Sequence, residues 1–385
     1  MGTWIDSTLR GWLGVNLLPP DKASGFVGLV SFAKGFPSVL LSPLSGVLVD
    51  RWGSRRVLIF SQILDTVNAA IMAYLVYSNV LTPLQLLILS FFSGISGAFY
   101  IPSRSTFIGR IVPRNLLPNA LAMHAFIFNL ARMLGPSLAG FIARCWGIAT
   151  GFLVNAISFV PLLLIVPTIP VEYEEKVVKR RGSFLSDLRE GLSFVLSNNE
   201  LLWTFLSAFV YSFFGVSYST LMQVFARNVV KTDLLGYGLI MGSMGLGALG
   251  GALLAGSMEA DEVASVREEI FLFFIGLSTF GVVLWPRSAF FLSFVNGMCQ
   301  VVFFNITNSR TQFLSPEDKR GRVLSIYSLV TNGGSPLGAF TLGFLGNVVG
   351  IRDSYLFIAL VLLSYSLLRF FAKKTVLVSK SHRSK

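Results

Sequence analysis

Six ionisable side chains lie inside stretches of the sequence that are otherwise apolar. Charged groups at the depth of a lipid bilayer are costly, so they generally face an aqueous cavity or pair with one another. A member of such an ion pair can gain or lose a proton. These residues imply no covalent chemistry. We therefore expect these residues to line a cavity and to couple it to an ion. They are Asp6, Arg10, Lys34, Asp65, His124 and Arg132.

Asp6 is the acid that we expect to pair with Lys34 or Arg132. By helical rise, Lys34 lies roughly 15 Å inside the outer end of its apolar segment, and Arg132 lies roughly 24 Å from the inner end of its own. The two cations therefore approach one depth, which Asp6 could also reach. Protonation of Asp6 would break the pair and bias the protein between inward and outward conformations. The alternative is a permanent salt bridge that only holds this half of the protein together.

Asp65 and His124 allow more than one role. Asp65 lies roughly 12 Å inside the inner end of its segment and could act on the loop after residue 50. His124 could switch its charge near neutral pH, although a hydrogen-bonded packing histidine explains the same position.

The segments that hold these charges have the composition of a membrane protein. Of 385 residues, 53% are hydrophobic and 13% are charged, whereas soluble domains carry about 25% charged residues. The mean hydropathy is +0.69. The apolar blocks are about 20 residues long, as a bilayer crossing requires, and they are apolar all round. We predict an all-α polytopic membrane protein with eleven complete transmembrane helices plus a partial first helix. The complete segments are 24–48, 57–77, 83–108, 116–143, 147–167, 200–226, 234–257, 269–286, 288–312, 322–348 and 353–372.

The net charge of +12 is distributed unevenly between alternate loops. If the loop after Asp50 faces the cytoplasm, most loop arginines and lysines lie on that side, which is the positive-inside bias. A nucleic-acid-binding protein would instead need its basic residues on one folded face. The pattern predicts a multi-pass protein of the cell membrane with a cytoplasmic C-terminus and no nucleic-acid partner.

One long polar stretch divides the chain. Apolar residues from Phe184 to Val195 recur there at helical spacing, as in a helix that lies on the inner membrane surface. A structural strut and a binding site both fit this helix. We predict an N-terminal helical bundle over 1–167 with a partial helix 1, a cytoplasmic linker with an amphipathic helix over 168–199, a C-terminal bundle over 200–372 and a basic cytoplasmic tail over 373–385.

The two halves resemble each other in sequence. Ser103-Arg104, a proline-containing loop and a helix with an internal proline followed by a glycine recur about 200 residues later, starting at Ser309-Arg310. A duplication with the same orientation in each half predicts two pseudo-symmetric six-helix bundles around a shared cavity. The candidate residues of the second-half loop are Arg310, Arg320, Gly321 and Arg322.

Residues 46–56 read G-V-L-V-D-R-W-G-S-R-R. The first glycine allows two helices to approach closely, the aspartate places an anion at a helix end, and the second glycine permits a sharp turn. This segment resembles the signature between helices 2 and 3 of the major facilitator superfamily. The resemblance implies the major facilitator fold and a gate latch formed by Gly46, Asp50, Arg51, Gly53, Arg55 and Arg56.

The resemblance extends over nearly the whole chain. Residues 132–140 read R-M-L-G-P-S-L-A-G and resemble the helix-5 motif associated with export, which implies a bend at Gly135, Pro136 and Gly140. A tightly packed helix pair explains the same residues. Together with residues 189–194 and 320–327, these segments resemble the subfamily of macrolide-type drug exporters and the enterobactin exporter.

The chain departs from the family pattern at residues 258–262, which read M-E-A-D-E where the family often has a basic echo of the first signature, so a second latch is not assigned there. It also departs from the pattern at two other places. Residues 86–100 carry no charge, so the basic motif of the family's helix 4 is absent. Residues 2–18 span roughly 25 Å as a helix and look like the second half of the family's first helix. We therefore expect a first helix that is truncated, either by a start assigned too late or by genuine shortening.

These patterns predict a secondary active transporter and not an enzyme. We expect proton-coupled efflux of small amphiphilic or hydrophobic compounds, drug-like or siderophore-like, by alternating access. The expected partners are the lipid bilayer, a small-molecule substrate and protons, and the chain is expected to be a monomer. We expect no cofactor and no metal, because Cys145 and Cys299 have no pairing or metal-ligand pattern and are expected to be buried. The alternatives are an importer of the same fold, a shortened non-transporting paralogue, and an intramembrane enzyme or scramblase.

Overall fold

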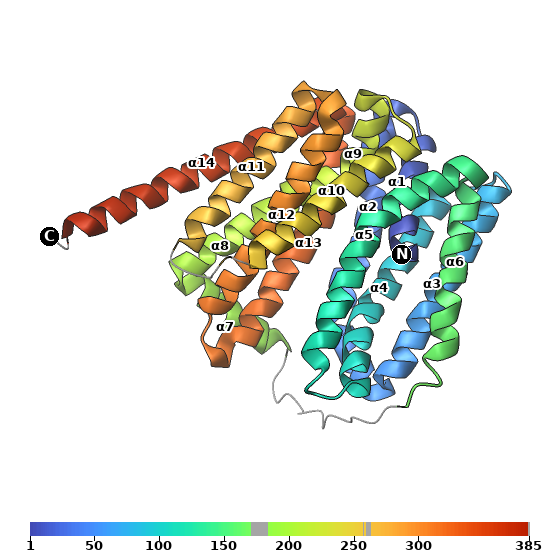
Figure 1. The fold of residues 1–385 in the computed structure, drawn as a ribbon, viewed down its shortest axis with the longest axis horizontal. Helices are drawn as coiled ribbons and strands as arrows, with labels where there is room; N and C mark the ends of the chain where they lie inside the picture. The colour runs from blue at the N-terminus through green and yellow to red at the C-terminus, as the bar shows by residue number, and fades with distance from the viewer. Residues whose placement is uncertain (171–183, 257, 259–262, 384–385) are drawn as a thin grey trace.

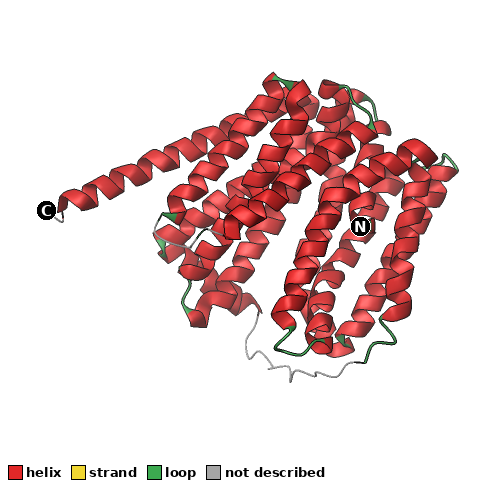
Figure 2. Cartoon of the chain, viewed as in Figure 1, coloured by secondary structure: helices red, strands yellow, loops and turns green. Residues whose placement is uncertain are grey.

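The computed structural model describes residues 1–170, 184–256, 258 and 263–383. These residues form helices joined by short turns, and no strand occurs among them (Figure 2). The predicted all-α fold is therefore confirmed. Much of the predicted linker, most of the loop before residue 263 and the end of the basic tail lie outside the described residues.

The first half contains six helices whose ends follow from local sequence. Thr82 caps one helix in a capping box with Gln85, and Pro83 follows at the first helical position, where its missing N–H costs nothing. Gly53 and Gly147 adopt φ of +85° and +87° at two turns, a conformation that favours glycine. The helices are α1 Gly2–Asn16, α2 Pro20–Trp52, α3 Ser54–Tyr77, α4 Pro83–Ile111, α5 Leu117–Trp146 and α6 Ile148–Ile165.

The second half begins with a short helix and continues with longer ones. Its first long helical segment, Asn199–Val230, is α-helical with two π-helical turns. The elements are α7 Phe184–Ser197, α8 Asn199–Val210, η1 Tyr211–Gly215, α9 Val216–Phe225, η2 Ala226–Val230, α10 Leu234–Gly256, α11 Ala264–Leu284, η3 Pro286–Ser288, α12 Ala289–Phe313, α13 Glu317–Val349 and α14 Ile351–Arg383.

Nine helices in the described part of the chain are long and apolar enough to cross a membrane. All eleven predicted segments are helical, but α11 and α13 do not belong to these nine. Both helices begin with several charged residues, which lowers their hydropathy. The count of eleven complete crossings therefore stays a prediction. The expected partial first helix corresponds to α1, which has 15 residues.

The two halves touch at one end of the molecule and separate toward the other (Figure 1). We call the end with the turns at Pro19 and Gly147 the closed end, and the end with the turn at Gly53 the open end. At the closed end, Asn347 Oδ1 of α13 accepts hydrogen bonds from Ser24 Oγ at 2.7 Å and from the Gly25 backbone N–H at 2.8 Å. These contacts join α2 to α13.

The second seam, between α5 and α10, follows the same pattern. Ser137 Oγ of α5 donates to the Gly238 carbonyl of α10 at 3.0 Å near the closed end. Toward the open end, a Cβ added at Gly256, which lies on the same face of α10 as Gly238, would meet no described atom within 4 Å, and Leu253 is 83% exposed. The two seams therefore close on the same side of the molecule.

The main buried core also lies across the junction of the halves. It includes Leu9 of α1, Phe152 of α6, and Phe225 and Tyr355 of the second half. Many large apolar side chains on the outside are exposed, as expected of helices surrounded by lipid. Cys299 is buried as expected, but the same expectation for Cys145 was wrong, because this residue lies exposed in the last turn of α5.

Candidate functional site

A buried charge cluster joins α1 to α2 and α3. Arg10 Nε donates to Asp6 Oδ1 at 2.9 Å and to Oδ2 at 2.8 Å, since residues four apart share one face of a helix. Lys34 Nζ lies 3.5 Å from Asp6 Oδ2 and donates to Ser7 Oγ at 2.8 Å. Arg10 Nη2 also donates to Asn68 Oδ1 of α3. Asp6 and Arg10 are 4% and 3% exposed, so these ion pairs are shielded from solvent.

Asp65 belongs to the same region as this cluster. It lines a small cavity of about 90 Å³ inside the first half, together with Asp6, Arg10 and Lys34. Gln62 and Asn68 complete part of the polar wall. The structure thus places Asp65 beside the cluster, and its suggested action on the loop after residue 50 stays a prediction.

A second cavity, of about 240 Å³, lies between the halves, and we call it the central cavity. Arg10 and Lys34 line this cavity as well as the small one, so they stand between the two. The opposite wall comes from α9 and α10, with Gln223 and Tyr237 among its residues. Both halves therefore contribute to the central cavity, as a shared binding chamber requires. Its other lining residues are Trp4, Ser7, Thr8, Gly11, Val27, Val30, Ser31, Pro136, Ser219, Thr220 and Met241.

Arg132 and His124, both on α5, lie apart from the cluster. The Arg132 guanidinium carbon lies 5.9 Å from the centroid of the Trp4 ring. Of the two expected partners of Asp6, the structure thus provides Lys34 and not Arg132. His124 lies 6.5 Å from the Phe128 ring, in the partly exposed section of α5 toward the open end. Neither residue borders the central cavity.

The segment around residue 50 forms the corner between α2 and α3 at the open end. Gly53 makes the turn with its positive φ. Arg55 holds the end of α6, because its Nη2 donates to the Ile169 carbonyl and its guanidinium lies 6.0 Å from the Phe107 ring. Arg51 and Arg56 are exposed, and the Asp50 side chain lies outside the described residues.

Gly46 differs from its expected role in this structure. A Cβ added there would meet no described atom within 4 Å. The close helix approach expected at Gly46 is therefore absent here, because the halves are separated at the open end.

The helix-5 motif is a packing surface. A Cβ on Gly135 would overlap Trp4 of α1, and one on Gly140 would lie 2.7 Å from the Leu235 Cα of α10. The Pro136 carbonyl meets α10 at Gly238. Since α5 stays helical through Pro136, the tightly packed helix pair is the interpretation that this geometry favours.

Sequence reasoning missed a second charge cluster, and it misplaced Arg310. This residue is not in a loop, because it lies in the last turn of α12 and is 7% exposed. Its guanidinium pairs at 3.2 Å with both Glu268 of α11 and Glu200 of α8. Nearby, Arg369 Nε of α14 lies 3.5 Å from Glu269 Oε1. Side chains of α8, α11, α12 and α14 meet in this cluster. In the sequence these helices share only a charged residue near the end that lies in the cluster, acidic in α8 and α11 and basic in α12 and α14.

The other three second-half candidates lie near the start of α13. Arg320 and Gly321 are exposed. Arg322 Nη1 donates to Glu190 Oε1 of α7 at 2.7 Å. This ion pair attaches the linker helix α7 to the second half.

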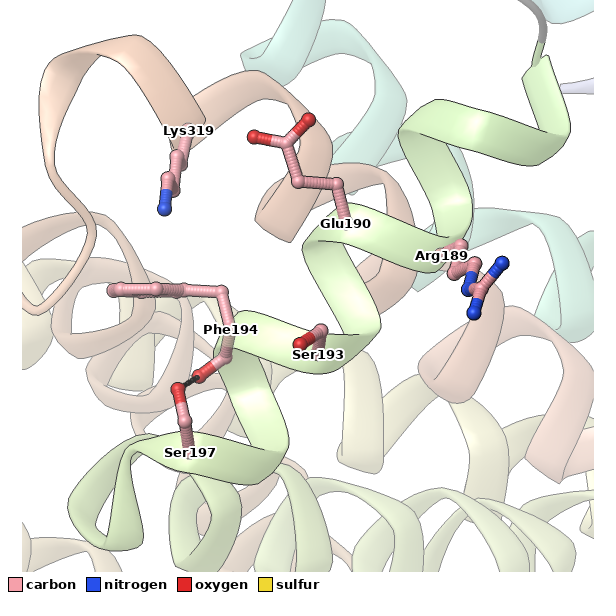
Figure 3. Close-up of a pocket in the computed structure, with 6 residues that line it drawn as sticks. All are labelled: Arg189, Glu190, Ser193, Phe194, Ser197 and Lys319. Atoms are coloured by element: carbon pink, nitrogen blue, oxygen red, sulfur yellow. Dashed lines mark hydrogen bonds between the residues drawn. The ribbon is translucent and has the colours of Figure 1, made fainter.

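A hollow of about 380 Å³ between α7 and α13 is a further possible site (Figure 3). Lys319 Nζ lies 5.1 Å from the Phe194 ring centroid, while Arg189 points away from Lys319. The two cations therefore do not converge on one ligand. Because Val195 of the same helix is buried against the second half, α7 has the geometry of a strut.

Comparisons with known proteins agree with this architecture. A family model described as "Transmembrane secretion effector" matches residues 1–384. The staphyloferrin A transporter of Staphylococcus aureus is 24% identical over 363 residues, which cover 92% of this chain and 88% of that protein. Macrolide efflux protein A of Streptococcus pyogenes is 19% identical over 347 residues, which cover 88% of this chain and 85% of that protein.

Solved structures show the same fold. A POT family transporter in complex with 5-aminolevulinic acid matches with a TM-score of 0.70 and 14% identity, over 95% of this chain and 92% of that one. A D-xylose-proton symporter matches with a TM-score of 0.66 and 14% identity, over 96% of this chain and 97% of that one. At this identity the likeness concerns the arrangement of the helices alone.

Proposed function

Because the chain belongs to the transmembrane secretion effector family and is a membrane transporter of the major facilitator type, we propose that it exports small amphiphilic compounds by alternating access, coupled to protons. The proposal places the open end and the C-terminus in the cytoplasm. It describes a single chain in the cell membrane, without cofactor or covalent chemistry.

The observation that carries this proposal is the asymmetric contact between the halves. They pack together at the closed end, separate at the open end, and share a cavity with both polar and apolar walls at the junction. A Cβ added at Gly46 or Gly256 would meet no described atom within 4 Å. Small residues let helices approach closely. The glycines nearer the closed end of the same two seams already make such close contacts between the halves. The open-end glycines would form the matching contacts when the halves rock to the other state.

The Asp6 cluster supports coupling to protons. A buried ion pair holds its geometry only while both members are charged. A proton on Asp6 would weaken its contacts with Arg10 and Lys34 and would change how α1 is held against α2. Because α1 also lines the central cavity, this change would reach the substrate site and bias the two conformations.

Export is the direction that the relatives support, since they include efflux proteins. An importer of the same fold is the alternative. The test is accumulation of fluorescein, rhodamine 123 and ethidium in cells with and without the chain, each in the presence and absence of a proton uncoupler. An exporter lowers accumulation of at least one dye, and the uncoupler removes the difference. Higher accumulation in expressing cells would favour import, and equal accumulation of all three dyes would oppose transport of this substrate class.

A further inference from the structure

We infer that the central cavity binds the anionic head of an amphiphilic substrate, with Arg10 and Lys34 as the residues that recognise it. This inference rests on the proposed transport function and narrows its substrate class. It replaces a general preference for hydrophobic compounds with a preference for organic acids that carry a carboxylate or a similar anionic oxygen.

The charged side chains around the central cavity share one sign. Arg10 and Lys34 line it, and no acidic residue appears among the described residues that do. Asp6 and Asp65 lie on the other side of these cations, in the small cavity inside the first half. The charged side chains that line the central cavity are therefore both cations, which favours an anionic group there over a cationic one.

Both cations have N–H donors that their neighbours in the protein do not use. A guanidinium has five N–H donors and an ammonium has three. Arg10 uses Nε for Asp6 and Nη2 for Asn68, while its buried Nη1 has no acceptor among the described residues. Lys34 donates to Ser7 and faces Asp6 at 3.5 Å, which leaves one of its three N–H groups, and its side chain is 29% exposed. An anionic oxygen is the acceptor that both groups bind most strongly.

The opposite wall fits the remainder of such a molecule. The second half contributes the hydroxyls of Ser219 and Thr220 and the amide of Gln223. The buried Gln223 Oε1 accepts no hydrogen bond from a described residue, so it can accept one from a substrate hydroxyl. Val30 and Met241 provide apolar surface beside these groups. A ligand held on both walls would contact both halves, as transport by rocking requires.

The experiment compares two dyes that share one aromatic ring system and differ in charge. Fluorescein is an anion at neutral pH, and rhodamine 123 is a cation. Binding of each is measured by fluorescence anisotropy on the purified full chain. We expect fluorescein to bind at least about tenfold more tightly than rhodamine 123, because the hydrogen bonds involved are charge-assisted. Lys34→Gln should remove about tenfold of the fluorescein affinity and leave rhodamine 123 binding unchanged or stronger.

The matched control is Lys22→Gln, which removes the same charge from an exposed site near the start of the same helix. It should leave both affinities unchanged. Elution volume and melting temperature in detergent establish that each variant is folded. If Lys34→Gln does not fold, Gln223→Leu provides the second route, with an expected loss of fluorescein affinity that Lys22→Gln does not show.

Several results would overturn the inference. Tighter binding of rhodamine 123 to the unmodified chain would do so, as would equal loss of fluorescein affinity in Lys34→Gln and Lys22→Gln. Failure of the transport proposal is recognised separately, because spin labels across the open end report the rocking motion whatever dye is bound. A chain that rocks but ignores charge contradicts only the substrate inference, whereas a chain that does not rock contradicts the proposed function.

Discussion

Gly343→Ala tests whether the closed-end contact between α2 and α13 sets the conformational equilibrium. A Cβ at Gly343 would lie 2.5 Å from the Ser24 carbonyl oxygen and 3.2 Å from the Gly28 Cα, both backbone atoms that cannot rotate away. The first distance is about 0.9 Å short of the 3.4 Å at which ordinary contact begins. The helices must therefore separate, and overpacking of this kind costs about 1–3 kcal/mol.

That cost applies to the state with a closed seam and disappears when the seam opens. At 1.4 kcal/mol per factor of ten, the ratio of this state to the other falls by roughly 5- to 150-fold. Spin labels on cysteines at Asn115 and Asp318, both exposed at the open end, measure the change by double electron–electron resonance. We expect a shorter distance to gain population in Gly343→Ala.

Gly333→Ala is the matched control on the same helix. Its added Cβ would lie 3.9 Å from Val39 Cγ1, an ordinary contact, while its gain in helix propensity is the same. A folded Gly343→Ala protein whose distances equal those of the unmodified chain would refute the reasoning. An equal shift in Gly333→Ala would show that helix propensity, and not the seam, is responsible.

Three further perturbations test other parts of the molecule. Asp6→Asn keeps the shape of the side chain and removes its charge. Dye export should therefore lose its sensitivity to an uncoupler in the cell assay. Full sensitivity to the uncoupler would exclude Asp6 as the coupling residue. Arg310→Met removes the cation shared by Glu268 and Glu200, and it should destabilise the second half by about 3 kcal/mol in detergent unfolding. Adding Glu268→Gln should restore part of that loss, and the absence of any loss would show that the ion pairs do not stabilise the bundle. Gly53→Ala places a side chain at φ +85° and should lower the melting temperature through about 1–3 kcal/mol of backbone strain, whereas an unchanged temperature would mean that the turn relaxes.

The sequence by itself determined the helices and the class of protein. Segment length and composition decide whether a stretch is helical and solvated by lipid, and both are local properties. The turn at Gly53 was predictable for the same reason, because only local backbone sterics require glycine there. Helical rise also placed Asp6 and Lys34 at one depth, and the structure brings them within 3.5 Å.

Only the tertiary structure decided which groups meet. Rise along a helix gives depth but not the direction in which a side chain points across the bundle, so Arg132 could reach the right level and still lie against Trp4. The ion pairs of Arg310 could not be foreseen, because its partners come from α8 and α11, which are distant in sequence. The sequence also could not predict which end of the molecule is closed. Small residues occur along the whole of both seams, and the sequence is the same in every conformation of the chain.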